Sequence, residues 1–497
     1  MAENKILLGY ATQDKARGSG VYPVHLNLKR ANRHGLIAGA TGTGKTVTLQ
    51  ALAESFSQQG VPVFLADVKG DISGISQAGK PHPKVNERLQ ALGLPTDRWR
   101  GCPTVFWDLY GKQGHPVRAT ISDMGPVLLS RLMGLNETQE GVMNIAFAVA
   151  DDNGLLLLDL KDLRAMLRHV AETASALNNL YGNVSASSIG AIQRRLLALE
   201  RSGAKKFFGE PMLDLHDLMR VDAEGAGVVN VLVADRLIQE PAVYSTLLLW
   251  LLSELFENLP EIGDPDKPKL VLFFDEAHLM FKDTPKALVE KVEQVVRLIR
   301  SKGVGVYFIT QSPGDIPDTV LAQLANRVQH ALRAFTPKEQ KAVRVAAQTF
   351  RSDDSFSVQD AIGEMGVGEA LVSTLMASGA PSMVRRTMVK PPVSRIGAAS
   401  KAEVYEILME SPLAEKYAST IDRESAFEKL AQRAEAAAQA AAQKKPPPKQ
   451  AHATPKPRGR PRQSIAETFA KSVVRSLGGS AGRALVRGIL GSLFKGS

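Results

Sequence analysis

One short motif constrains this chain more than any other feature of its sequence. Residues 39–46 read GATGTGKT and match the pattern G-x-x-x-x-G-K-[ST]. The apolar run His34–Ala38 before it predicts a buried strand, and Thr46–Ser57 after it predicts a helix. A glycine-rich loop between a strand and a helix presents backbone N–H groups and the positive end of the helix dipole to an anion. The motif therefore predicts a phosphate-binding loop.

Each residue of this loop has a chemical task in binding a nucleotide. The Lys45 ammonium neutralises the β- and γ-phosphates, and the Thr46 hydroxyl ligates Mg²⁺. The glycines let the backbone wrap closely around phosphate. We therefore expect ATP and Mg²⁺ as cofactors. The residues expected to contact the nucleotide are Gly39, Ala40, Thr41, Gly42, Thr43, Gly44, Lys45, Thr46 and Val47.

Two acidic residues follow another apolar run, Leu270–Phe274. Ligands bind at the carboxyl ends of the strands in parallel sheets, so we expect these acids to face the phosphate-binding loop. Asp275 is predicted to bind Mg²⁺, and Glu276 is predicted to activate the attacking water. Gln311 directly follows the apolar run Val304–Thr310, where its amide suits sensing of the γ-phosphate.

Apolar runs that alternate with helical periodicity indicate an α/β protein with a mainly parallel sheet. Further strands are predicted at Val61–Ala66, Thr104–Trp107, Val228–Val233, Leu332–Phe335 and Ser382–Val389. The predicted divisions are a first part of the core (1–70), a largely helical insertion (71–227), the rest of the core (228–393), a helical extension (394–443), a Pro/Lys/Arg-rich disordered linker (444–464) and an amphipathic C-terminal segment (465–497).

The positive charge of the chain is concentrated in its C-terminal part. The whole sequence has a net charge of +10, while residues 436–497 hold twelve Lys/Arg and one acid, a net +11. Residues 1–435 therefore carry −1, so the folded body is expected to be close to neutral. Within the tail, residues 457–461 read PRGRP and resemble an AT-hook core, although a basic linker is the plainer interpretation. Either form would attract nucleic acid in a salt-sensitive way.

Other features of the composition bear on where the protein works. Cys102 is the only cysteine, which excludes an intramolecular disulfide and fits a reducing compartment. No run of about 18 apolar residues occurs, so no integral membrane segment is predicted. The N-terminus lacks the apolar stretch of a signal peptide. We therefore expect a cytoplasmic protein.

Four segments occur in a set order: GATGTGKT, FLADVKGD, LVLFFDEAHLMF and VVRLIRSKGVGVYFITQSP. This order resembles the HerA/FtsK superfamily of ring-forming ATPases, and more closely the bacterial HerA-like branch that includes YjgR. The match extends over residues 6–393. The resemblance implies a RecA-like P-loop NTPase core. It also implies that Asp67, which is followed by Asp71 in the second segment, positions water or metal.

The same resemblance implies an arginine that acts on a neighbouring subunit. HerA-like motors place an arginine just before the strand that ends in Gln311, and this arginine reaches the ATP of the adjacent subunit. Arg300 occupies that position, and Arg297 lies one helical turn earlier. The resemblance therefore implies a homo-oligomer, typically a hexameric ring.

The leading hypothesis is a Mg²⁺-dependent ATPase that acts as an oligomeric motor on DNA, with a nuclease or another protein as a further partner. One alternative is an ATPase whose client is a protein, as in secretion or remodelling. A second alternative is an ATP-binding scaffold with negligible turnover, docked through its basic tail onto a partner or an anionic membrane surface.

Overall fold

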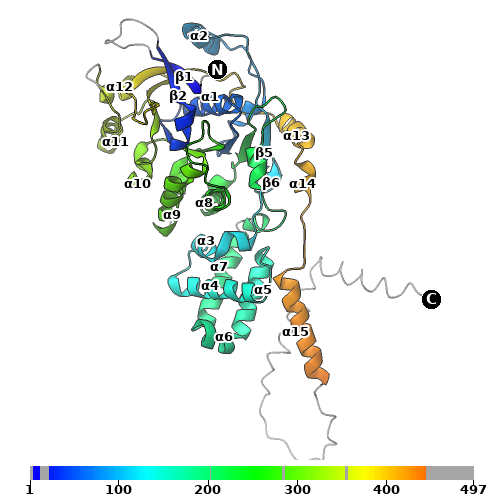
Figure 1. The fold of residues 1–497 in the computed structure, drawn as a ribbon. Helices are drawn as coiled ribbons and strands as arrows, with labels where there is room; N and C mark the ends of the chain where they lie inside the picture. Colours follow the sequence, from blue (N-terminus) through cyan, green and yellow to red (C-terminus); the bar gives the residue numbers. More distant parts are fainter. Residues whose placement is uncertain (1–3, 12–21, 202, 282–285, 353–355, 444–497) are drawn as a thin grey trace, which may run out of the picture.

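The computed structural model describes residues 4–11, 22–201, 203–281, 286–352 and 356–443. Within these residues one twelve-stranded sheet forms the middle of the core, with further helices to one side of it (Figure 1). The strands are β1 (Lys5–Ala11), β2 (Tyr22–Asn27), β3 (Gly35–Ala38), β4 (Val63–Asp67), β5 (Thr104–Asp108), β6 (His115–Pro116), β7 (Val229–Val233), β8 (Leu270–Phe274), β9 (Val304–Thr310), β10 (Asn326–Gln329), β11 (Glu369–Ser373) and β12 (Arg385–Val389). Their order across the sheet is β2-β1-β12-β11-β10-β3-β9-β8-β4-β7-β5-β6.

Helices connect these strands, and some cover the sheet while others pack together beside it. They are α1 (Lys45–Gln58), α2 (Pro83–Ala91), α3 (Ile121–Leu132), α4 (Glu137–Asp152), α5 (Leu160–Glu172), α6 (Ala174–Tyr181), α7 (Ala186–Arg201), α8 (Pro241–Asn258), α9 (Lys286–Leu298), α10 (Asp318–Leu321), α11 (Pro337–Gln348), α12 (Val358–Glu364), α13 (Lys401–Glu410), α14 (Ala414–Ala418) and α15 (Ala426–Gln443). None of the helices in the described ranges combines the length and the apolar character that a bilayer span requires.

The larger part of the sheet is parallel, as predicted. Every neighbouring pair from β10 to β6 in the order above runs in the same direction. Ala38 at the end of β3 pairs with Thr310 at the end of β9, and Phe274 at the end of β8 pairs with Ala66 of β4. The carboxyl ends of these four strands therefore lie along one edge, where ligands bind in such sheets.

The remaining part of the sheet is antiparallel, and the sequence analysis misses most of it. β1 and β2 pair with each other, and β1 continues through β12 and β11 to β10. The strand predicted at Leu332–Phe335 is wrong, because the strand in this region, β10, ends at Gln329. Leu332 instead packs against α11 and α12 in a small core of its own, and the Phe335 side chain is 87% exposed.

Alternate side chains of the central strands build a hydrophobic core on each face of the sheet. On one face, Val271 and Phe273 of β8 share a core with Phe56 of α1. On the other face, Leu272 and Phe274 share a core with α8 and α9. Because both faces are covered, the central strands are apolar throughout, which is typical of parallel sheets and explains why they are readily predicted.

Helices α3 to α7 form a layer beside the core (Figure 1). Within this layer α3 lies against α4, and α4 and α7 both lie against α5, while α3 also contacts α8 of the core. The layer comes from the stretch 71–227 that predicted a helical insertion. The same stretch also supplies β5 and β6, which extend the core sheet beyond β7.

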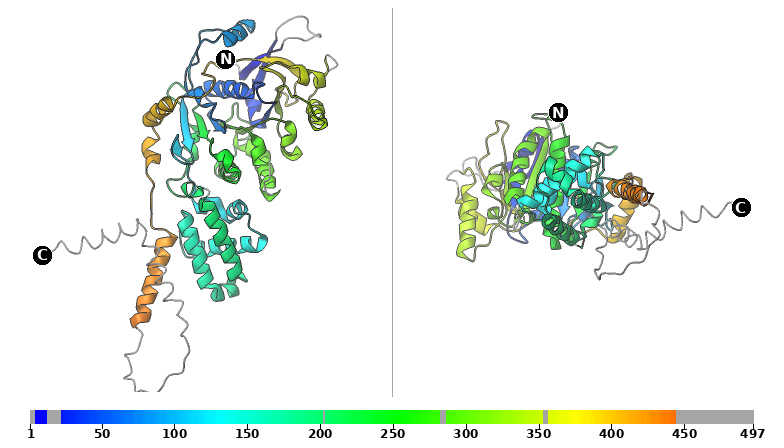
Figure 2. Two further views of the ribbon diagram at one scale, coloured as in Figure 1. Left: turned by 180° about the vertical axis from the view of Figure 1, so that it is seen from behind. Right: turned by 90° about the horizontal axis from the view of Figure 1, so that it is seen from below.

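The chain after the last strand runs along the edge of the sheet and on to the helical layer (Figure 2). α13 lies against β5, α14 lies against β6, and α15 lies against α5. Residues 401–443, which we call the C-terminal segment, thus connect the core edge to the helical layer. The predicted linker 444–464, the predicted amphipathic segment 465–497 and the AT-hook-like stretch lie outside the described residues.

Candidate active site

The predicted phosphate-binding loop lies between β3 and α1, at the carboxyl edge of the parallel strands. β3 ends at Ala38 and α1 begins at Lys45. Gly44 has a φ of 114°, in the left-handed region where a side chain would strain the backbone. At Gly39 an added Cβ would lie only 2.5 Å from the His330 Cβ. The glycines of the motif are therefore required by the shape of the loop itself.

The Lys45 ammonium lies over this loop. Its Nζ donates hydrogen bonds to the carbonyl oxygens of Gly39 and Ala40, at 2.6 and 3.0 Å. Burial lowers the pKa of Lys45, the neighbouring Lys69 ammonium lowers it further, and nearby carboxylates oppose both effects. A bound phosphate would bring negative charge and acceptor oxygens to this ammonium, so the loop suits an anionic ligand.

Asp275 follows β8 at the same edge of the sheet, and its charge acts on Lys45. Its Oδ1 accepts a hydrogen bond from Glu276 N at 2.9 Å, while its Oδ2 is buried without a hydrogen-bond partner in the part of the chain that the structure describes. Burial raises the pKa of Asp275 to about 6. A buried carboxylate oxygen that lacks a donor is suited to a metal ion.

The other protein groups of the site agree with Mg²⁺ held together with a phosphate. Thr46, the second predicted ligand, stands in the first turn of α1 and is partly exposed. The described ranges contain no group of three or more His, Cys, Asp or Glu residues that would hold a metal by themselves. Mg²⁺ commonly takes one or two protein ligands and completes its shell with phosphate oxygens and water. Asp275 and Thr46 therefore fit this ion.

Glu276 has an unusual backbone conformation and three polar neighbours. Its φ of 47° lies in the left-handed region, which costs a non-glycine residue about 1 kcal/mol or more. Lys69 Nζ lies 2.6 Å from Oε1, His278 Nδ1 lies 3.2 Å from Oε2, and Gln311 Nε2 donates to Oε2 at 3.4 Å. The predicted base and the predicted sensor are therefore in contact.

The environment of Glu276 keeps its side chain ionised. Burial acts to raise the pKa of this carboxyl, but Lys69, with smaller contributions from His278 and Gln311, outweighs burial, so the pKa is lowered. Glu276 is consequently a carboxylate at neutral pH. That is the protonation state in which a carboxyl group can accept a proton from water.

Asp67 shapes the loop that carries Lys69. Its two carboxylate oxygens accept backbone hydrogen bonds from Gly70 N at 2.7 Å and from Ile72 N at 3.1 Å. Burial raises the pKa of Asp67 to about 6. Asp71 differs, because its Oδ1 is buried without a partner among the residues the structure covers, and its charge acts on Asp275. The free oxygen in this loop therefore belongs to Asp71, while Asp67 holds the loop in place.

Arg300 and Arg297 lie away from the other predicted site residues. Both side chains are exposed, and Arg300 belongs to the turn that precedes β9. β9 is seven residues long and Gln311 follows its far end, so about 20 Å of strand separates that turn from Gln311. Neither arginine reaches the phosphate-binding loop of its own chain.

The sequence analysis missed two residues that support the site. Lys69 lies between the two acids of the segment DVKGD. A lysine flanked by acids was the sequence feature that could have indicated its role. His330 follows β10, which was not predicted. Its Nδ1 donates to Glu369 O at 2.8 Å, so its Nε2 accepts from Thr48 Oγ1 at 2.9 Å. Burial lowers the pKa of His330 to about 4, so the neutral ring fixes α1 behind the loop.

An open cleft of about 1040 Å³ leads away from the phosphate-binding loop. Ala40 and Thr41 of the loop line it together with Gln311, and Phe335 also contributes to its wall. This volume is at the upper end of the range of ligand pockets. The space beside the loop is therefore sufficient for a nucleotide.

Comparison with known proteins decides the family of the chain. Residues 12–497 match the family described as Helicase HerA-like C-terminal. This chain belongs to the HerA-like family. The resemblance expected from the four ordered segments is thereby confirmed.

Two curated relatives of this HerA-like chain carry the name HerA. It is 22% identical over 367 residues to the DNA double-strand break repair helicase HerA of Saccharolobus solfataricus, an alignment that covers 70% of this chain and 63% of the relative. It is also 22% identical over 371 residues to the protein of the same name from Sulfurisphaera tokodaii, covering 72% of this chain and 65% of the relative. The HerA-like chain therefore spans less than two thirds of the length of these relatives.

Solved structures with a similar fold include the bacterial conjugative coupling protein TrwB. Its unbound form aligns with a TM-score of 0.51 and 14% sequence identity, covering 80% of this chain and 95% of TrwB. TrwB in complex with the non-hydrolysable GTP analogue GDPNP aligns with a TM-score of 0.50 and 14% identity, covering 80% and 97%. These similarities confirm the predicted RecA-like P-loop core.

Proposed function

We propose that this HerA-like protein hydrolyses ATP with Mg²⁺ and works as an oligomeric motor on DNA. The proposal rests on three side chains at one edge of the sheet: Lys45 over the loop, Asp275 with an unpaired buried oxygen, and Glu276 as a carboxylate. A phosphate-binding loop beside a metal-binding acid and a base is the arrangement that phosphoryl transfer to water requires.

In this mechanism the loop amides and the Lys45 ammonium bind the β- and γ-phosphates. Thr46 and Asp275 would hold Mg²⁺, which when bound neutralises charge on those phosphates. The Glu276 carboxylate accepts the proton of the attacking water, and Gln311, 3.4 Å away, orients that water. Lys69 keeps Glu276 ionised and fixed in direction.

The assembly part of the proposal depends on Arg300. This side chain is exposed and about 20 Å of strand from its own site, so any action on phosphate must be on a neighbouring subunit. An arginine supplied in trans stabilises the charge of the transition state and makes hydrolysis depend on assembly. We therefore propose a ring, and a hexamer by resemblance to the superfamily.

DNA is proposed as the substrate because the curated relatives carry the name of DNA repair helicases. The decisive measurement is ATP hydrolysis by the purified full chain with and without duplex DNA, alongside its mass in solution. We expect turnover per subunit to rise with protein concentration and again when DNA is added. If the fully assembled protein hydrolyses ATP at the same rate with and without DNA, the DNA motor is contradicted and a protein client is favoured. Negligible turnover under all conditions would favour the ATP-binding scaffold.

Mixed assemblies test whether Arg300 acts in trans. Arg300→Ala subunits retain their own loop and base, and Glu276→Gln subunits retain their arginine. We expect each variant alone to lose about a hundredfold or more in turnover, and the mixture to regain part of it. A mixture of Lys45→Ala and Glu276→Gln is the matched control, because both lesions lie within a subunit's own site and cannot complement. Equal recovery in the two mixtures, or none in either, would refute the assignment. Arg297→Ala, tested in the same way, shows which arginine acts.

A further inference from the structure

A second cleft lies where three parts of the chain meet, away from the candidate active site. It has a volume of about 860 Å³ and shares no lining residue with the nucleotide cleft. Its walls come from the loop after β5, from the helical layer and its connection back to the core, and from the C-terminal segment around α14. A ligand bound here would contact the core edge, the helical layer and the C-terminal segment together.

Arg118 is the side chain in this cleft that most needs a ligand. It is only 8% exposed, and its Nη1 is buried without a hydrogen-bond partner in the described part of the chain. Burial lowers the pKa of Arg118, and no acid among the residues that the structure describes raises it again. A buried charge without a counter-charge is unfavourable, and a buried polar group without a partner in a folded protein calls for an explanation. An anion in the cleft would supply the missing counter-charge.

Two further cations of the cleft are free to join Arg118. Lys205 and Lys206 line the same cavity and are exposed. Neither forms an ion pair with an acid in the ranges that the structure describes, and the contact of Lys206 is a long one of 3.5 Å from Nζ to Tyr110 O. Three cations of one cavity thus lack a counter-charge within the described part of the chain.

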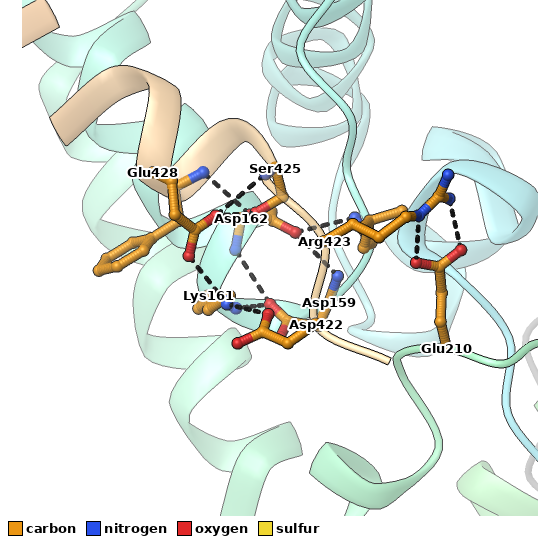
Figure 3. A network of polar contacts seen from close by, with 10 residues as sticks. Asp159, Lys161, Asp162, Glu210, Asp422, Arg423, Ser425 and Glu428 are labelled. Carbon is orange, nitrogen blue, oxygen red and sulfur yellow. Dashed lines mark hydrogen bonds and ion pairs between the residues drawn. The ribbon is translucent and has the colours of Figure 1, made fainter. Parts of the chain in front are cut away.

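The acids that line the cleft are already engaged, as Figure 3 shows. Glu210 forms a two-pronged ion pair with Arg423, with one N–O distance of 2.5 Å. Asp422 pairs with Lys161 at 2.8 Å. The third acid, Asp159, caps α5 and accepts hydrogen bonds from the first backbone amides of that helix. None of these carboxylates neutralises Arg118, so the cleft carries an excess of positive charge.

The cleft also has apolar walls beside these cations. Tyr110 and Phe208 contribute aromatic surface, and Ile421, whose side chain is 52% exposed, contributes aliphatic surface. A bare inorganic anion would use only the charged part of such a site. An organic molecule that carries a phosphate group would use both parts.

We propose that this cleft binds the phosphate group of a nucleotide-sized ligand through Arg118, Lys205 and Lys206. The planar guanidinium offers a fork of N–H donors that matches phosphate oxygens, and the lysines add two point charges. The ligand is either a free nucleotide or a terminal nucleotide of a nucleic acid, which share this chemistry. This site is separate from the phosphate-binding loop and does not depend on hydrolysis of ATP.

Binding measurements on the full chain test the site. Calorimetric titration with inorganic phosphate, adenosine monophosphate and a short 5′-phosphorylated oligonucleotide is performed in a Lys45→Ala background, which removes the charge of the loop. We expect Arg118→Gln to weaken binding by at least about tenfold, and the double change Lys205→Gln/Lys206→Gln to weaken it about three- to tenfold. The matched control is Lys80→Gln/Lys84→Gln, a pair of exposed lysines outside the cleft.

Thermal unfolding gives a readout that a purely structural arginine would not produce. Without ligand, Arg118→Gln should melt no lower than the parent protein, because it removes an uncompensated buried charge. With ligand, the Lys45→Ala parent should gain melting temperature, and the same protein carrying Arg118→Gln should not. Ligand-induced stabilisation that survives both cleft variants would overturn the proposal. Equal affinities in Lys205→Gln/Lys206→Gln and in the control Lys80→Gln/Lys84→Gln would also overturn it. Both of these variants keep Arg118, so they test the site without changing the buried residue. The ligand that binds best distinguishes a free nucleotide from a nucleic-acid end.

Discussion

Two polar regions of this protein differ in how completely their buried carboxylates are hydrogen-bonded. At the junction between α5 and residues 421–428, the buried Asp162 is fully engaged (Figure 3). Its Oδ1 accepts from Ser425 Oγ and Phe427 N, and its Oδ2 accepts from the backbone of residues 158 and 159. At the candidate active site, Asp275 is equally buried, but its Oδ2 has no donor within the described residues.

The number of hydrogen bonds thus distinguishes a carboxylate that joins two segments, such as Asp162, from one that is suited to bind a ligand, such as Asp275. Hydrogen bonds to charged groups stabilise a fold when every lone pair is used, as at Asp162. An oxygen buried without a donor is unfavourable until a cation or a proton arrives. The predictions below test this contrast, and they are ordered by the size of the expected effect.

The largest effect is expected at the base. Glu276→Gln keeps the size of the side chain but removes its ability to accept a proton, so ATP turnover should fall about 10³-fold, equal to about 4 kcal/mol of activation free energy. Steady-state hydrolysis and the melting temperature are measured together. The melting temperature should stay within a few degrees of the parent value. Normal turnover in Glu276→Gln would show that another group activates the water.

At the junction the expected loss is of stability. Asp162→Ala leaves three backbone N–H groups without an acceptor, and the Ser425 hydroxyl keeps only Glu428 as an acceptor, so the free energy of unfolding of the helical layer should fall by about 3 kcal/mol. Denaturant unfolding followed by circular dichroism measures this loss. Basal turnover of the remaining folded protein should be retained, since Asp162 touches no nucleotide-binding residue. A parent-like unfolding midpoint would mean that the network stabilises little.

The two regions should also respond to pH in opposite directions. The pKa of Asp275 is about 6 in the fold against 3.8 unfolded, so its contribution to metal-free stability is present below pH 3.8 and is lost as the pH rises through about 6. The pKa of Glu428 at the junction is lowered by Ser425 and Lys161 against the effect of burial, so its contribution is present above its unfolded value of 4.5 and is lost as the pH falls.

Melting curves between pH 4 and pH 8 measure this contrast. The parent protein should lose stability as the pH rises from 4 to 6, and Asp275→Asn should show a smaller loss. Mg²⁺ with nucleotide should offset this loss in the parent protein but not in the variant. The affinity for Mg²⁺ should decline below about pH 6, because a protonated Asp275 cannot ligate the ion. A melting profile that Asp275→Asn leaves unchanged would contradict the raised pKa.

The smallest effect is expected from a partly exposed cation of the junction. Lys161 pairs with Asp422 at 2.8 Å and with Glu428 at 3.0 Å, but Asp422 is largely exposed. Lys161→Met should therefore cost about 1 kcal/mol or less of unfolding free energy, and less still in high salt. Lys286→Met, which removes a more exposed pair with Glu290, is the matched control and should be neutral. A cost well above that of the control at high salt would indicate a role other than ion pairing.

The sequence predicted those parts of the protein in which local pattern and global fold agree. Buried parallel strands are apolar throughout, so β3, β8 and β9 were recognisable, and the carboxyl ends of such strands meet at one edge. For this reason Asp275, Glu276 and Gln311 could be expected near the phosphate-binding loop. The contact between Gln311 and Glu276 agrees with that expectation.

The features that could not be predicted from the sequence depend on contacts between residues that are far apart in the chain. Lys69 gained its importance only when the loop after β4 lay beside Glu276 at the end of β8. In the sequence Arg118 resembles an ordinary surface arginine, and only the structure shows that it is buried without an acid beside it among the described residues. The antiparallel strands β1, β2 and β11 carry weaker periodicity, and the apolar run at Leu332 packed on helices instead of forming a strand.

The path of the C-terminal segment has a practical consequence. α15 lies against α5 and leads away from the sheet, so its last turn at Gln443 is far from the edge that carries the phosphate-binding loop (Figures 1 and 2). A fluorophore, an affinity tag or a solid support attached to the exposed residues 435–440 of α15 should leave nucleotide access unobstructed. Single-molecule recordings of an immobilised protein can therefore be anchored at that end.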